Sequence, residues 1–453
     1  DELASYLGWK GSEVVIRAQL RAPAMRARRV VEPEIVPVTV VGDPDTIAWL
    51  DLPLTPDVTT VARYAVDAGC HVGVLPVDDA MDEVRTARLP APTVVIMAAV
   101  PLHDIGGGSR GAQLAFELVR RSYSVVYVHR FPTAESTDLG LRYLHPRLMQ
   151  VSYDRFDAAS LALRSTPGLV VVEAPIRDFV APLELLVREG WSSVYDIIDD
   201  WTDRSLGGDW YDAEVERSIA GLVTAVTASA PDLVSHATRL GRNAVLVPNG
   251  VNEVVFATAL DHRRPPDLPP GRVIGYHGSL YGEWFDWDAL AHVADAFPGH
   301  AIAVIGDDGG VRRSLPTNIH FLGLKPQGDL PAYLGHLEVG VVPFVVNDVT
   351  HAVSPLKVFE FLAAGVPVAA PPLRALDGVS GVTTDVDLAV AVEGAIRGPR
   401  PDPVRALAEH GWGGRLRILF DAVGWDLSDV DGSTVRVVTR KPVHHRREDR
   451  LVH

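Results

Sequence analysis

The residue types best suited to chemistry stand close together near position 355. Ser354 is a favoured helix N-cap residue, and Pro355 suits the first helical position, where a missing N–H costs nothing. Gly365 suits the left-handed residue that ends many helices. The pattern predicts a ten-residue helix whose N-terminus, with free N–H groups and the positive dipole end, could hold an anion. Lys357 at the third helical position would add a positive charge there.

Glu360 lies three residues after Lys357, on the same face of the predicted helix and about 4–5 Å further along its axis. Because a carboxylate accepts two hydroxyl donors, phosphates at the helix N-terminus and a diol beside Glu360 would suit a nucleoside diphosphate. The same residues equally allow a capped helix with a Lys–Glu pair that binds no ligand.

A glycine-rich segment at residues 101–111 follows an expected strand and opens an expected helix. Its glycines at 106, 108 and 111 match the G-x-G-x-x-G pattern of dinucleotide-binding proteins. The first glycine lies several residues past the strand, however, and the next strand ends in His129 and Arg130 without a ribose-binding acid. Arg130 could pair with a 2′-phosphate, so an NADP oxidoreductase is a minority alternative, and a mobile surface loop is another.

Two neighbouring acids, Asp199 and Asp200, follow the strand expected at residues 193–198. Ligands of open α/β sheets bind at the carboxyl ends of strands, so these acids could bind hydroxyl groups of a ligand, act as a base or chelate a metal. Capping of a helix is an equally good interpretation. His103 and Asp104 in the glycine-rich segment are further candidates for contacts with a ligand.

Alternating apolar strands and helical segments position these residues. Strands are expected at residues 93–99, 124–128, 148–151, 169–172, 193–198, 223–227 and 244–247, then at 273–276, 301–305, 319–322, 339–343 and 366–370. Helices are expected at residues 113–121, 182–189, 286–297, 329–336, 355–364 and 387–397. The alternation predicts two α/β domains with doubly wound parallel sheets, separated by turn and proline-rich residues at 248–271.

The segment at residues 354–368 resembles the nucleotide-sugar-binding motif of GT-B glycosyltransferases, especially the large family-4-like group (glycosyl transferases group 1). In that group Ser-Pro-x-Lys-x-x-Glu precedes Ala-x-Gly-x-Pro-Val. Residues 275–286 look like the first strand and loop of the group's C-terminal domain, and residues 247–251 look like its interdomain crossover. Residues 410–412 and the helix after them look like its C-terminal helices, so the resemblance covers roughly residues 93–425.

The resemblance implies a GT-B fold, with two tandem Rossmann-like domains that face a cleft. It divides the chain into an N-terminal α/β appendage at residues 1–92, an acceptor domain at 93–250 and a nucleotide-sugar-binding domain at 251–412. A helix at about 413–425 would pack back on the acceptor domain, and residues 426–453 would form a basic tail.

The activity implied is that of a hexosyltransferase-type glycosyltransferase, which moves a sugar from a nucleoside-diphosphate sugar to an acceptor hydroxyl with retention. No cofactor and no catalytic metal are expected. The implied donor-binding residues are Gly107, Gly108, Gly278, Ser279, His351, Ser354, Pro355, Leu356, Lys357 and Glu360. The catalytic candidates are Lys357, His103, Asp104, Asp199 and Asp200.

One position departs from the group's pattern. The group often has a second glutamate eight residues before the ribose-binding one, and Ala352 stands there in this chain. Sugar recognition therefore needs other groups, and an inverting enzyme would need a base among Asp104, Asp199 and Asp200. A sugar-nucleotide 2-epimerase of GT-B fold and a non-catalytic GT-B scaffold that partners another transferase are further alternatives.

The composition of the chain limits the classes of molecule that it could bind. A net charge of −16 over 453 residues argues against nucleic acid, which needs a basic face. The longest apolar run, residues 93–102, is too short to span a bilayer, so at most peripheral membrane contact is expected. The single cysteine, Cys70, allows no internal disulfide and favours a cytoplasmic location. The acceptor could be a sugar, a natural product or a lipid-linked molecule.

Overall fold

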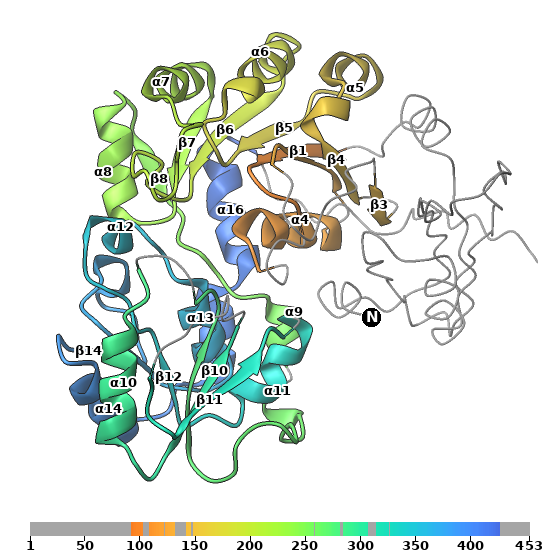
Figure 1. Ribbon diagram of the computed structural model, residues 1–453. Coiled ribbons are helices and arrows are strands. Elements are labelled where there is room, and N and C mark those ends of the chain that lie inside the picture. The colour runs from red at the N-terminus through yellow and green to blue at the C-terminus, as the bar shows by residue number, and fades with distance from the viewer. Residues whose placement is uncertain are drawn as a thin grey trace, which may run out of the picture.

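The computed structural model describes residues 92–102, 108–121, 123–131, 142–145, 148–257, 259–280, 284–306, 314–325 and 327–425. These residues form two α/β units, each built on one sheet, and Figure 1 shows the first unit above the second. The appendage expected at residues 1–92, apart from its last residue, and the tail expected at 426–453 lie outside the described residues. No helix in the described ranges combines the length and the hydropathy needed to cross a membrane.

The first sheet has eight strands in the order β3-β4-β2-β1-β5-β6-β7-β8, and β3 runs antiparallel to β4 while the other pairs are parallel. Its strands are β1 (Thr93–Ala98), β2 (Ser124–His129), β3 (Arg142–His145), β4 (Leu148–Ser152), β5 (Leu169–Val172), β6 (Ser192–Ile197), β7 (Ala225–Ala228) and β8 (Ala244–Leu246). The helices between them are α4 (Arg110–Arg120), α5 (Ala158–Arg164), α6 (Val180–Arg188), α7 (Ala213–Leu222) and α8 (Pro231–Arg239), with short 3₁₀ turns η2 (Tyr153–Arg155) and η3 (Arg177–Phe179).

Strand β1 shows why the strands of this sheet are apolar at successive positions in the sequence. Val94 and Ile96 belong to the core that contains α4, whereas Val95 and Met97 belong to the core on the opposite face of the sheet. Figure 1 shows α5, α6 and α7 on one side of the sheet and α4 on the other. Because helices cover both faces, both sets of alternating side chains must be apolar.

The second sheet has six parallel strands in the order β11-β10-β9-β12-β13-β14. They are β9 (Val273–His277), β10 (Ala301–Ile305), β11 (Ile319–Gly323), β12 (Val339–Val341), β13 (Val368–Ala370) and β14 (Val382–Thr384). Its helices are α9 (Glu253–Phe256), α10 (Trp287–Ala296), α11 (Leu330–Leu334), α12 (Asp348–His351), α13 (Leu356–Ala363), α14 (Leu388–Arg397) and α15 (Pro403–His410), with 3₁₀ turns η4 (Ala259–Asp261), η5 (Gln327–Asp329) and η6 (Arg374–Leu376).

The chain returns to the first unit at its last described helix, α16 (Trp412–Ala422), which contacts α4, β7 and β8 (Figure 1). Trp412 at the start of α16 is fully buried, and Val251 of the crossover pairs with Gly411 just before it. The two units therefore share one apolar core around the crossover.

The α/β class with two doubly wound parallel sheets is confirmed, and every strand and helix expected between residues 93 and 397 is present within a few residues. Strands β3 and β14 were not predicted. Both lie at sheet edges, where one side of the strand lacks a partner and the apolar signal is weak.

Candidate active site

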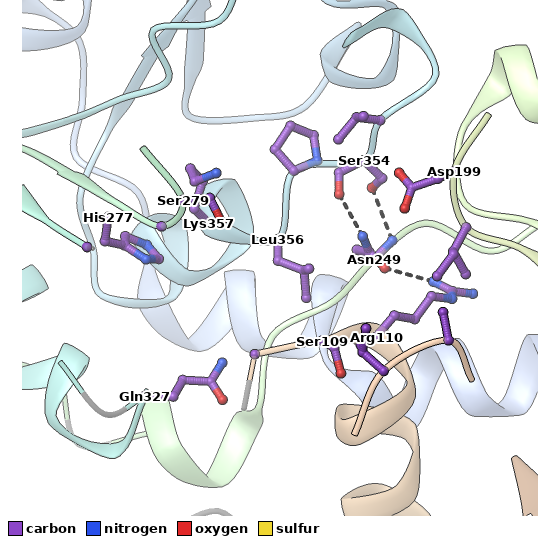
Figure 2. Close-up of a pocket in the computed structure, with 18 of the residues that line it drawn as sticks. Ser109, Arg110, Asp199, Asn249, His277, Ser279, Gln327, Ser354, Leu356 and Lys357 are labelled. Atoms are coloured by element: carbon purple, nitrogen blue, oxygen red, sulfur yellow. Dashed lines mark hydrogen bonds between the residues drawn. The ribbon is translucent and has the colours of Figure 1, made fainter. Parts of the chain in front are cut away.

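A cavity of about 560 Å³ lies between the two units, where the carboxyl ends of their strands face each other. The first unit contributes residues after β1, β5 and β6 and the start of α4, and the second contributes residues after β9 and β10 and the start of α13. Strand carboxyl ends are where open α/β sheets bind ligands. Figure 2 shows side chains from both units converging on this space.

Helix α13 differs from its prediction at the N-terminus. It spans eight residues, Leu356–Ala363, and its N-cap residue is Pro355. The expectation that Ser354 caps the helix is wrong, because the Ser354 hydroxyl accepts the Asn249 backbone N–H at 3.1 Å and the Ser354 carbonyl accepts Asn249 Nδ2 at 2.6 Å (Figure 2). Gly365 has φ of 69°, the left-handed conformation expected after the helix.

The N-terminus of α13 opens on the cavity, which Ser354, Pro355, Leu356 and Lys357 all line. The backbone N–H groups of Leu356 and Lys357 have no acceptor within the described ranges. A helix cannot satisfy its own first N–H groups, and together with the dipole they attract an anion. Lys357 is the second helical residue, not the third, so its charge lies one position closer to this anion site.

Lys357 is half-buried between aromatic rings and pairs with no carboxylate of the described chain. Its Nζ lies 5.1 Å from the centre of the Tyr276 ring and 4.7 Å from that of Phe344. Burial lowers the pKa of Lys357 to about 8, and the nearby Glu360 opposes this shift. Gly278 makes room for the side chain: its φ is 121°, and a Cβ there would lie 3.0 Å from Lys357 Cε.

Glu360 is buried and takes its hydrogen bond from Gln327, whose Nε2 lies 2.6 Å from Glu360 Oε1. Its other oxygen lies 3.4 Å from His277 Nε2, without the geometry of a hydrogen bond. Glu360 therefore does not form the ion pair with Lys357 that the sequence allowed. Burial raises the pKa of Glu360 to about 7, against the effects of Gln327 and Lys357. Burial and Lys357 lower the pKa of His277 to about 3, so its ring is neutral.

Of the neighbouring predicted acids Asp199 and Asp200, one reaches the cavity. Asp199 lines it, and burial, followed by the charge of Asp200, raises the Asp199 pKa to about 7. Figure 2 shows the Asp199 carboxyl facing the segment around Ser354. Asp200 instead accepts the Thr202 N–H at 3.1 Å and the Thr202 hydroxyl at 2.6 Å, which is a local turn.

A third acid, Glu173, was missed by the sequence reasoning. It follows β5 as Asp199 follows β6, so the rule that pointed to Asp199 would have found it. Glu173 lines the cavity, is 2% exposed and has no described partner for Oε1. Burial, with the charge of Asp196, raises its pKa to about 8, so this carboxyl is largely protonated at neutral pH.

Arg110 at the start of α4, the penultimate residue of the predicted glycine-rich segment, joins α4 to β6 and to the crossover. Its guanidinium makes a bidentate pair with Asp196, at 2.7 and 3.0 Å, and donates to Asn249 Oδ1 at 3.0 Å (Figure 2). Ser109 before it caps α4 by accepting the Ala112 N–H at 3.3 Å. Gly108, Ser109 and Arg110 line the cavity, so part of the predicted glycine-rich segment does belong to this site.

Aromatic rings form the wall of the cavity on the first unit. Trp210 lies between Phe131 and Trp201, with ring centres 5.9 and 5.3 Å away. Trp201 is buried, and its Nε1 has no hydrogen-bond partner in the described part of the chain. The wall thus combines apolar area with an unused N–H donor.

Several other predicted residues have different positions. Gly278 and Ser279 line the cavity, but the Gly278 N–H donates to Ile305 O at 2.9 Å and is not available for a phosphate. His351 does not line it, and its Nδ1 accepts the Arg374 N–H at 3.4 Å. His103, Asp104 and Gly107 lie outside the described residues.

The dinucleotide interpretation gains no support. Arg130, the candidate for a 2′-phosphate, pairs with Asp178 and stacks near Phe131 and Tyr153. Gly111 packs against Glu173, since a Cβ there would lie 2.4 Å from Glu173 Oε2. No group of three or more His, Cys, Asp or Glu side chains suited to a metal occurs within the ranges described.

Comparison with known proteins adds to this geometry. No protein-family model matches the chain. A Bacillus subtilis (strain 168) protein, provisionally named the teichuronic acid biosynthesis glycosyltransferase TuaH, is 30% identical over 141 residues. That match spans 28% of this chain and about a third, 34%, of the relative.

Solved structures resemble the chain over a larger part of its length. Sucrose-phosphate synthase from Thermosynechococcus elongatus is 16% identical, with a TM-score of 0.50 over 74% of this chain and 96% of that one. A UDP-forming alpha,alpha-trehalose-phosphate synthase from Burkholderia xenovorans is 12% identical, with a TM-score of 0.50 over 73% and 98%. Anabaena Alr3699/HepE in complex with UDP is 13% identical, with a TM-score of 0.50 over 73% and 99%. The two facing sheets and these likenesses together show that the chain has the GT-B fold.

Proposed function

We propose that this protein is a glycosyltransferase that moves a sugar from a UDP-sugar to the hydroxyl of a saccharide acceptor. The observation that carries the proposal is the meeting of three features in one cavity: the open N-terminus of α13, the unpaired cation of Lys357 and the buried carboxyl of Glu360. The provisional name of TuaH and the UDP held by HepE support this choice of reaction and donor.

The donor would lie along α13. Its diphosphate would accept the N–H groups of Leu356 and Lys357 and face the Lys357 ammonium, which has no anionic partner of its own. Its ribose hydroxyls would donate to Glu360, whose carboxylate lies one turn further along the same helix. A bound diphosphate would also favour the charged form of Lys357, reversing the effect of burial on its pKa.

Catalysis in this scheme is mainly electrostatic. As the bond between the sugar C1 and the phosphate oxygen breaks, negative charge grows on the departing UDP. Lys357 and the dipole of α13 already point at that charge, so they stabilise the transition state more than the bound substrate. The half-buried environment of Lys357 strengthens the effect, because little water screens it.

The acceptor would bind against the first unit. Its wall of Phe131, Trp201 and Trp210 offers flat apolar faces that suit the C–H faces of a sugar ring. Glu173 and Asp199 line this side of the cavity as well. Their carboxyl groups can exchange hydrogen bonds with hydroxyl groups, which favours a saccharide over a purely apolar acceptor.

The acceptor site has its own test. Trp210→Ala should raise the acceptor KM severalfold and leave the UDP dissociation constant unchanged, because Trp210 lines the acceptor side of the cavity only. Loss of UDP binding in this variant would contradict the division of the cavity into two sides.

Retention of the anomeric configuration is the stereochemistry that the sequence motif implies, and we propose it here. Proton NMR of the product anomer would test it. An inverted product would require a base for the acceptor hydroxyl, and Glu173 and Asp199 are the carboxyls placed on the acceptor side.

The donor proposal is tested by thermal unfolding in the presence of UDP, GDP, dTDP and NADPH. A ligand at 100 times its dissociation constant stabilises a protein by about 2.7 kcal/mol, which is easily seen as a rise in Tm. UDP should give the largest rise, and Glu360→Ala should reduce it. A rise with NADPH and none with any nucleoside diphosphate would refute the proposal. Incubation with a UDP-sugar alone, followed by product analysis, separates transfer from epimerisation.

A further inference from the structure

A continuous series of side-chain hydrogen bonds runs from the first unit to Glu360. Arg120 Nη1 donates to Asn252 Oδ1 at 3.0 Å, and Asn252 Nδ2 donates to Gln113 Oε1 at 3.1 Å. Gln113 Nε2 then donates to Gln327 Oε1 at 2.7 Å, and Gln327 Nε2 donates to Glu360 Oε1 at 2.6 Å. We call the three amides Asn252, Gln113 and Gln327 the amide relay.

The two ends of the amide relay fix its direction. The arginine can only donate and the ionised glutamate can only accept, so each amide must accept from the Arg120 side and donate towards Glu360. Amide dipoles aligned in this way polarise one another and strengthen the last bond. The relay thus favours the ionised form of Glu360, which burial alone would disfavour.

The relay also joins three parts of the chain that are far apart in sequence. Gln113 lies on α4 of the first unit, Asn252 caps α9 at the crossover, and Gln327 begins η5 of the second unit. All three amides are buried, with exposures of 1%, 1% and 4% for Gln113, Asn252 and Gln327. The Gln113–Gln327 bond is therefore a buried contact between the two units.

We propose that the amide relay is a positioning device, in which Gln113 of the first unit holds Gln327 so that Gln327 orients the Glu360 carboxylate for the ribose hydroxyls of the donor. This inference rests on the proposed function, in which Glu360 binds the ribose. Its consequence is that the fit of the two units against each other and the affinity for the nucleotide are coupled. By reciprocity, a bound nucleotide favours the arrangement in which Gln113 and Gln327 meet.

If the amide relay only stabilised the fold, it would use the same contacts, so the test must measure the effect of the ribose hydroxyls separately. Isothermal titration calorimetry with UDP and with 2′,3′-dideoxy-UDP, which lacks those hydroxyls, does so. The comparison uses the wild type, Gln113→Leu and Gln113→Glu. Gln150→Leu is the matched control, because Gln150 is a buried glutamine of the same unit whose Oε1 accepts the Leu102 N–H at 2.8 Å outside the relay.

Gln113→Leu should weaken UDP binding about tenfold, equivalent to about 1.4 kcal/mol, and change dideoxy-UDP binding by less than about twofold. Gln113→Glu should weaken UDP at least as much. A carboxylate at 113 accepts from both neighbours, so the Gln327 amide would turn and present its oxygen to Glu360. Gln150→Leu should leave the dissociation constants of both nucleotides unchanged.

The pH dependence gives a second measurement. The groups that face Glu360 are Lys357 on its own helix, His277 of β9 and Gln327 of η5. Without the hydrogen bond from Gln327, the carboxylate is less stable, so the pH at which UDP affinity rises should be higher in Gln113→Leu than in the wild type. Gln113→Asn, which is too short to span both bonds, replaces the leucine variant if that variant does not fold.

The outcomes are distinct. Equal weakening of UDP and dideoxy-UDP, or no weakening of either, overturns the relay while leaving the proposed function in place. A wild type that binds neither UDP nor another nucleoside diphosphate overturns the proposed function itself.

Discussion

Substitution of Lys357 by methionine removes one positive charge and little volume. Methionine is close in length to the lysine stem, and it suits the space between Tyr276 and Phe344, whose ring centres lie 5.1 and 4.7 Å from Lys357 Nζ. The variant should therefore fold normally, and a change in rate would report the charge alone.

The size of the effect follows from Coulomb's law. Two unit charges about 4 Å apart interact by about 4 kcal/mol at the effective dielectric constant of about 20 found near protein surfaces. If about half a unit of negative charge develops on the departing diphosphate, Lys357 stabilises it by about 2 kcal/mol, which corresponds to a change of about thirtyfold in kcat. The KM for the donor should rise less than kcat falls, because the charge acts most strongly in the transition state.

The assay is UDP release from a panel of UDP-sugars, with kcat and KM measured separately. Lys325→Met is the matched comparison, because Lys325 also lines the cavity but already pairs with Asp267 at 2.8 Å. Its kcat should stay within about threefold of the wild type, as expected for a partly exposed ion pair. A Lys357→Met enzyme with normal kcat and a raised KM would show that the lysine only binds the donor, and the electrostatic argument would fail.

Three further predictions follow from described contacts. UDP affinity should be greatest between about pH 7 and 8, because Glu360 ionises as the pH rises through about 7 and Lys357 loses its charge above about 8; a flat calorimetric profile would contradict this. Arg110→Met should lower the free energy of unfolding by about 3–5 kcal/mol, since Asp196 is left buried without its cation; urea denaturation measures it. Gly278→Ala should weaken UDP binding, because alanine is strained at the positive φ of this position and its Cβ would push against the Lys357 side chain. An unchanged dissociation constant by calorimetry would show that Gly278 is not needed to place Lys357.

The helix that carries the site could be predicted from sequence because its signals are local. Proline near the start and glycine after the end located α13 to within two residues. The cap was misassigned for a physical reason: Ser354 meets Asn249, which lies 105 positions earlier in the chain, and no local pattern reveals that contact.

The amides around Glu360 could not be predicted for the same reason. Gln113, Asn252 and Gln327 share no motif, and ordinary sequence reasoning treats buried glutamines as surface residues. Glu173 was different, because the carboxyl end of β5 was predicted and the residue after it could have been identified. Long-range polar contacts therefore could not be predicted from the sequence, whereas residues at the ends of predicted strands could be identified.

Asn249 joins the crossover to three other parts of the chain. Its N–H and Nδ2 bind Ser354, its Oδ1 accepts Arg110, and its carbonyl accepts Arg415 Nε at 3.1 Å. Any change in the relative position of the two units must therefore keep or break these contacts, which lie beside the start of α13.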